Sequence, residues 1–101
     1  MLLYIKPDQK TKILIEVTQD DITNGIRQSA TNCMVSRAAM RVLSYFQPTV
    51  ISCNPRQMHI FGWKAARFGY KEISFDSYVT SKIRAFDGGY KVEPFSFEIE
   101  I

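Results

Sequence analysis

The sequence predicts an α+β fold: a small, mostly antiparallel sheet of about 5–6 strands, with two main helices at about 32–46 and 77–87 packed on one face. Three observations support this class. Apolar residues recur at helical spacing between residues 31 and 46, and they alternate with polar residues between 92 and 101. Three short strand-like runs, separated only by turns, lie between the two helices, which is typical of an antiparallel meander.

The first main helix is predicted in the stretch from Thr31 to Phe46. Its apolar residues recur at i, i+3, i+4, i+7, i+8 and i+11, on one face: Val35, Ala38, Ala39, Val42, Leu43 and Phe46. Thr31 or Asn32 is the expected N-cap. Pro48 ends the helix because proline disfavours helical geometry in the residue before it. The two alanines allow a close approach of a sheet, so we expect the strands to wrap this helix.

Two further helices have their own start signals. Thr18 is the expected N-cap of a short helix, because Asp21 stands where a capping-box acid would. Ile22 and Ile26 should face the core, and Asn24-Gly25 should end this helix. The second main helix is capped by Asp76 or Ser77 and closed by Gly88-Gly89, and its predicted buried stripe is Val79, Ile83 and Phe86.

The remaining apolar runs are predicted to be strands. The last one is the clearest, because Phe95, Phe97, Ile99 and Ile101 alternate with polar residues. The first two are expected to form a hairpin, and the next three the meander. The predicted strands are 2–5, 12–17, 49–53, 57–63, 70–75 and 92–101.

Length and composition limit the class of protein. A chain of 101 residues predicts a single domain, 1–101. No apolar run reaches the ~18 residues that cross a bilayer, and the start, MLLYI, lacks the basic region of a signal peptide. We therefore expect a cytoplasmic protein with no membrane partner. Cys33 and Cys53 are expected to be two ordinary buried thiols, with a disulfide or a reactive thiol as the alternatives.

The sequence provides few groups for catalysis. His59 is the only histidine, and nothing around it marks a general base. A zinc site needs about four nitrogen or sulfur ligands, whereas the chain holds only Cys33, Cys53 and His59. We therefore expect a non-enzymatic protein with no catalytic residue, metal or cofactor.

The distribution of charge is more informative than the net charge of +3. The window 22–71 contains seven cations and no acidic residue, whereas both flanking segments are net acidic. Within it, residues 54–71 interleave cations with the rings of Phe61, Trp63, Phe68 and Tyr70. Cations neutralise phosphates and exposed rings stack on bases, which is typical of a surface for single-stranded DNA or RNA. The candidate anion-binding residues are Arg37, Arg41, Arg56, Trp63, Lys64, Arg67 and Lys71.

Other interpretations of these residues stay open. The rings could form the core while the cations are solvated in loops. Arg37 and Arg41 could pair with Glu98 or Glu100, within the chain or across an interface.

Two blocks, 13–40 and 77–101, resemble a group of short uncharacterised proteins of tailed bacteriophages and environmental virus-like sequences. The shared pattern is a strand followed by T-x-x-D/H-I-x-x-G, a stretch of small residues and a cysteine that leads into the helix, and an ending like I-x-x-F-D-x-G-x-x-V-x-P-F-S-F. Met34 departs from it, because proline often follows the cysteine in the group. The matching residues are Thr18, Asp21, Ile22, Gly25, Cys33, Ile83, Phe86, Asp87, Gly89, Val92, Pro94, Phe95, Ser96 and Phe97. The resemblance implies a phage-like origin and a host-cytoplasm setting, and it implies no activity.

Two functions are therefore expected. The first is a small phage-type accessory protein that binds another protein or a second copy of itself, as a homo-oligomer, through the strand Phe95 to Ile101. The alternative is a nucleic-acid-binding module that uses the basic and aromatic segment 54–71.

Overall fold

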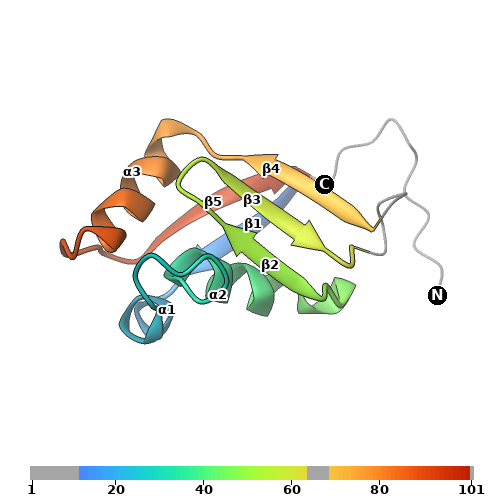
Figure 1. The fold of residues 1–101 in the computed structure, drawn as a ribbon, viewed down its shortest axis with the longest axis horizontal. Helices are drawn as coiled ribbons and strands as arrows, with labels where there is room; N and C mark the ends of the chain where they lie inside the picture. Colours follow the sequence, from blue (N-terminus) through green and yellow to red (C-terminus); the bar gives the residue numbers. More distant parts are fainter. Residues whose placement is uncertain (1–11, 64–68, 101) are drawn as a thin grey trace.

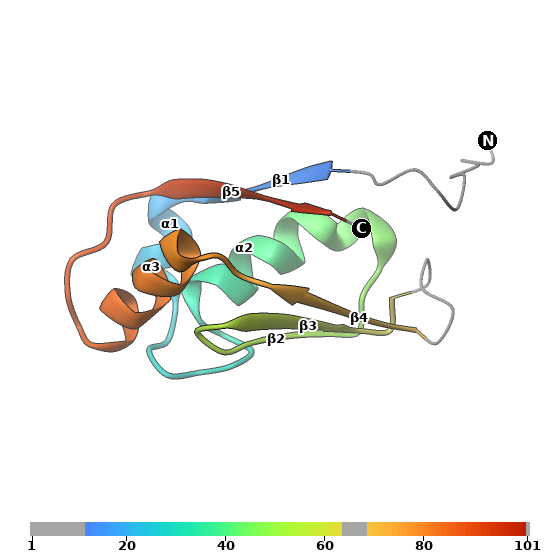
Figure 2. The ribbon, with the colours of Figure 1, turned by 90° about the horizontal axis from the view of Figure 1, so that it is seen from above.

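One helix lies between two small antiparallel sheets in the computed structural model, which describes residues 12–63 and 69–100 (Figures 1 and 2). Figure 2 shows the three layers, with helix α2 in the middle. One sheet consists of β1 (Lys12–Val17) and β5 (Phe95–Glu100). The other consists of β2 (Val50–Cys53), β3 (Gln57–Phe61) and β4 (Tyr70–Ser74), in that order. The helices are α1 (Gln19–Asn24), α2 (Met34–Val42) and α3 (Ser77–Asp87), with the 3-10 turn η1 (Leu43–Phe46) after α2.

The predicted α+β class is confirmed, and the meander β2-β3-β4 forms as expected. The strands differ from the prediction in forming two sheets rather than one sheet with the helices on one face. The reason lies in α2, whose buried residues are Met34, Val35, Ser36, Ala38 and Ala39. At 100° per residue they span an arc of about 200°, which is too wide for a single sheet to cover. The apolar stripe predicted for this helix omitted Met34 and Ser36, so it was narrower than the arc that α2 buries.

Both sheets place an apolar row against α2. In the first, Ile15 pairs with Phe97 and Val17 with Phe95. In the second, Ile51 pairs with Ile60, and Met58 pairs with Ile73. Figure 2 shows α1 and α3 at one end of these layers. The predicted first strand, 2–5, and the hairpin it would form lie outside the described residues.

The predicted helix starts are confirmed for α1 and α3. Thr18 and Asp21 form a capping box at α1, and the Asp76 side chain accepts the N–H of Val79 at α3. The prediction is wrong for α2, whose N-cap is Cys33. The prediction that Ile26 faces the core is also wrong. Ile26 is exposed because α1 ends at Asn24, before this residue.

Candidate functional site

The structure describes five of the seven predicted anion-binding residues, and it does not gather these five into one surface. Lys64 and Arg67 lie outside the described residues. Trp63 is only 2% exposed, and its ring packs 4.6 Å from the ring of Phe46. The positive φ of Gly62 turns the chain inward at this point. Trp63 is therefore a core residue and cannot stack on a base.

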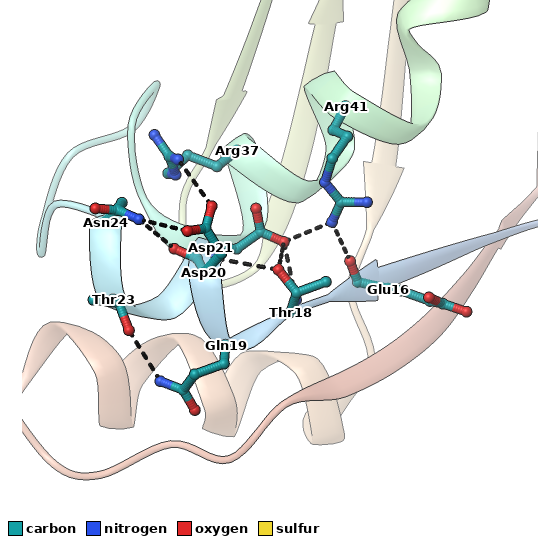
Figure 3. A network of polar contacts seen from close by, with 9 residues as sticks. All are labelled: Glu16, Thr18, Gln19, Asp20, Asp21, Thr23, Asn24, Arg37 and Arg41. Carbon is teal, nitrogen blue, oxygen red and sulfur yellow. Dashed lines mark hydrogen bonds and ion pairs between the residues drawn. The ribbon is translucent and has the colours of Figure 1, made fainter.

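Arg37 and Arg41 take part in a polar network between α1 and α2, which Figure 3 shows. A guanidinium nitrogen of Arg41 lies 2.6 Å from Oδ2 of Asp21 and 2.8 Å from the backbone oxygen of Glu16. Arg37 lies 3.8 Å from the carboxylate of Asp20. The partners of these arginines are therefore acids of α1, and not Glu98 or Glu100, because the capping box holds Asp21 at the start of the helix that packs on α2.

Asp21 is buried, with a side chain 5% exposed. Burial opposes its ionisation, but hydrogen bonds from the backbone and side chain of Thr18 and from Arg41 outweigh burial and lower the pKa of its carboxyl group. Asp21 is therefore charged at neutral pH and offsets the charge of Arg41. This part of the acid-free segment is not available as a basic surface.

The two remaining predicted cations lie apart from the exposed rings. Lys71 pairs with Ile60, whose side chain is buried. Neighbouring residues of a strand alternate between faces, so Lys71 and Tyr70 lie on opposite faces of β4. Arg56 is exposed in the turn before β3. A strand that alternates cations with aromatic residues therefore places the cations on one face of the sheet and the rings on the other. Composition alone does not show this separation.

The outer face of the three-stranded sheet carries a row of exposed apolar side chains. Val50 pairs with Phe61, and Phe61 pairs with Tyr70. The two rings lie 5.3 Å apart and are 45% and 39% exposed. The Tyr70 hydroxyl reaches Nδ1 of His59, whose ring stacks on that of Tyr70. Desolvation and the nearby Glu72 carboxylate raise the pKa of the Tyr70 phenol.

A groove separates the edges of β4 and β5. The two strands belong to different sheets and do not pair. One hollow of about 330 Å³ lies beside Phe75, Phe97 and the start of α3, and a second of about 440 Å³ lies beside Lys71, Lys12 and Glu100. Both hollows are lined by Ile73, Ser74, Glu98 and Ile99, so they form one continuous groove.

The groove has an apolar floor and a polar rim. Ile73 and Ile99 are buried, and the rings of Phe75 and Phe97 meet edge to face at 5.7 Å. Among the described residues, the rim holds two cations and four acids: Lys12, Lys71, Glu72, Asp76, Glu98 and Glu100. The sequence predicted β5 as a docking strand, but it contained no signal that β4 would offer a second edge opposite to it.

Several kinds of site are absent from the described part of the chain. Within residues 12–63 and 69–100, no group of three or more histidine, cysteine or acidic side chains could hold a metal ion. No helix in these ranges is long and apolar enough to cross a membrane. We compared the chain with models of known protein families, with curated proteins and with solved structures, and none of the three comparisons found a match.

Proposed function

We propose that the protein is a small, non-enzymatic accessory protein of phage type that binds an extended segment of another protein in the groove between β4 and β5. The observation that carries this proposal is the groove with an apolar floor that is lined by one edge strand of each sheet, β4 and β5. Strand edges bind extended peptides through backbone hydrogen bonds, and pockets for alternate side chains give specificity. An inserted strand would join the two sheets into one.

The direction of the two edges defines how a strand would enter. Phe75 contacts Phe97 at one end of the groove, whereas Lys71 and Glu100 line the other end. The residue numbers therefore run in opposite directions, and β4 and β5 are antiparallel. An inserted strand would be parallel to one edge and antiparallel to the other.

The charge of the rim indicates the chemistry of the partner. Four acids and two lysines give the part of the rim that the structure describes a net negative charge. A complementary segment would carry apolar residues at alternate positions, facing Ile73 and Ile99, with basic residues between them. The resemblance to phage proteins supports an accessory role in the host cytoplasm and adds nothing about the partner.

A library of random displayed peptides tests this proposal. We expect selected peptides to show alternating apolar residues with Lys or Arg between them, and to protect amides of β4 and β5 from hydrogen exchange. Glu98→Lys should lower the affinity for these peptides about tenfold or more. Glu93→Lys, the same change outside the groove, should leave the affinity unchanged. Protection confined to other strands, or equal binding by both variants, would contradict the proposal.

Self-association is a separate outcome of the same experiment. If a second copy occupies the groove, light scattering will show a mass that rises with protein concentration. Glu98→Lys will change the concentration at which this rise occurs. A monomer at all concentrations that also selects no peptide would refute binding in the groove.

The exposed rings of Phe61 and Tyr70 favour nucleic-acid binding as the second candidate function. Adjacent rings on the open face of a sheet can stack on unpaired bases. Labelled single-stranded DNA and RNA should then bind at low salt, with an affinity that falls steeply as salt rises. Tyr70→Ala should weaken binding, whereas Tyr90→Ala, at a tyrosine 75% exposed elsewhere, should not. The absence of binding at low salt would exclude this function.

A further inference from the structure

A third hollow lies at the end of the layers where α1 and α3 are found (Figure 2). It has a volume of about 380 Å³, and α1, the residues just after it, the end of α3 and the segment 89–92 line it. None of its lining residues lines the groove between β4 and β5. Small-molecule sites have volumes of about 300–1,000 Å³, so the hollow has room for a small ligand.

The charge of this hollow is positive. Among the described residues, Arg27 and Lys91 line it and no acidic residue does. Within residues 12–63 and 69–100, Arg27 forms no ion pair. Lys91 lies 3.3 Å from the carboxylate of Glu93, but the two side chains are 86% and 70% exposed, so water screens this pair. Both cations can therefore bind an anion.

Two contacts place Arg27 next to the segment that carries Lys91. The backbone N–H of Gln28 donates to the carboxylate of Asp87 at 2.8 Å, which ties the residues after α1 to the end of α3. The Arg27 guanidinium lies against the backbone of Gly89, because a Cβ added to Gly89 would lie 3.0 Å from Nη1 of Arg27. The backbone φ of Gly89 is +83°, a conformation that favours glycine. The fold therefore brings two cations from distant parts of the sequence to one hollow.

The floor of the hollow is apolar. Phe86 and Val92 are buried, and Ile22 is half-buried against the core. Gln19 and Thr23 add neutral polar groups at the border, where the Gln19 amide donates to the Thr23 hydroxyl at 3.1 Å. A ligand that fits these surroundings has an anionic group and an apolar body.

We propose that this hollow binds a small phosphomonoester, with the phosphate between Arg27 and Lys91 and the body of the ligand against Phe86 and Val92. A phosphomonoester carries a charge of about −1.5 to −2 at neutral pH, which matches the two cations. Its oxygens accept charge-assisted hydrogen bonds from a guanidinium and from an ammonium group. A carboxylate has only one negative charge and leaves one of the cations without a partner.

Titration of the ¹⁵N-labelled protein at low salt tests the site with three probes: phenyl phosphate, inorganic phosphate and benzoate. Phenyl phosphate should shift the amide resonances of Arg27, Gly89, Lys91 and Val92 saturably, and those of β4 and β5 should stay unchanged. Inorganic phosphate should bind more weakly because it lacks an apolar body, and benzoate because it has one charge. The proposal is overturned if phenyl phosphate and benzoate bind equally, if inorganic phosphate binds as tightly as phenyl phosphate, or if the shifts lie elsewhere.

Three variants at exposed positions assign the contacts, and the ¹⁵N spectrum of each variant establishes that it is folded. Arg27→Gln should lower the affinity for phenyl phosphate about tenfold or more. Arg84→Gln is the matched control, because it removes the same charge from α3 outside the hollow, and it should leave the affinity unchanged. Glu93→Gln removes the competitor for Lys91 and should raise the affinity about two- to fivefold. Equal losses for Arg27→Gln and Arg84→Gln, or a lower affinity in Glu93→Gln, would overturn the proposed site.

Discussion

Removing the charge of Asp21 should destabilise the protein although the residue lies outside the groove. In Asp21→Asn, shape and volume are kept, but the charged acceptor for Thr18 and Arg41 is lost. Loss of the capping interaction costs about 1 kcal/mol. The Arg41 side chain is 49% exposed, so water screens the ion pair and it contributes about 1 kcal/mol or less. The expected loss in the free energy of unfolding is therefore about 2 kcal/mol, or roughly 8–16 °C in Tm for a chain of this size.

Urea denaturation of four proteins measures this effect. They are the wild type, Asp21→Asn, Arg41→Met and the double variant, and the double-mutant cycle should give a coupling free energy of about 1 kcal/mol. Asp20→Asn is the matched control, because Asp20 is 78% exposed and lies 3.8 Å from Arg37. Its effect should stay within about 0.5 kcal/mol. Equal losses for Asp20→Asn and Asp21→Asn would refute the reasoning.

The pH dependence of the same variants has a defined sign. The bonds to Asp21 lower its pKa in the folded state below the ordinary value of 3.8. The stability that these bonds provide is fully present above that value and is lost as the pH falls through the folded pKa. The deficit of Asp21→Asn relative to the wild type should therefore shrink in acid. A deficit that grows as the pH falls below 3.8 would contradict the lowered pKa.

Two further predictions concern glycines in turns. Gly62→Ala should lower the free energy of unfolding by about 2 kcal/mol or more, because φ is +74° and the new Cβ would overlap the hydroxyl oxygen of Thr49. Gly69→Ala should lower the free energy of unfolding by only about 1 kcal/mol, because φ is +68° but the space around the new Cβ is open. Thermal denaturation of both variants measures the two losses, and a larger loss for Gly69→Ala would contradict a steric cause.

The sequence predicts those parts of the fold that depend on local pattern. The strand 12–17, the caps at Thr18 and Asp76 and the apolar stripe of α3 all follow from spacing and capping chemistry. The division into two sheets does not, because it depends on how much of the surface of α2 is buried. Met34 and Ser36 widen the buried arc, and their burial becomes visible only once both sheets are in place.

The candidate site was less predictable than the fold. The charge pattern identified Arg37 and Arg41, but it could not show that acids only about twenty residues earlier would pair with them. The alternating pattern predicts Trp63 as part of a strand, whereas the left-handed backbone of Gly62 directs the Trp63 side chain into the core. The N-cap of α2 is Cys33, which is not one of the usual capping residues, so the capping rule placed this helix start one or two residues too early.

The pairing of β1 with β5 has a consequence for the order of folding. These strands lie at the two ends of the described chain, so their sheet closes a loop that contains every residue from 18 to 94. The strands β2, β3 and β4 follow one another closely, and the entropy lost in closing their connections is correspondingly smaller. We expect these strands and α2 to assemble first and β5 to dock last. Substitutions in β5 should then accelerate unfolding more than they slow folding.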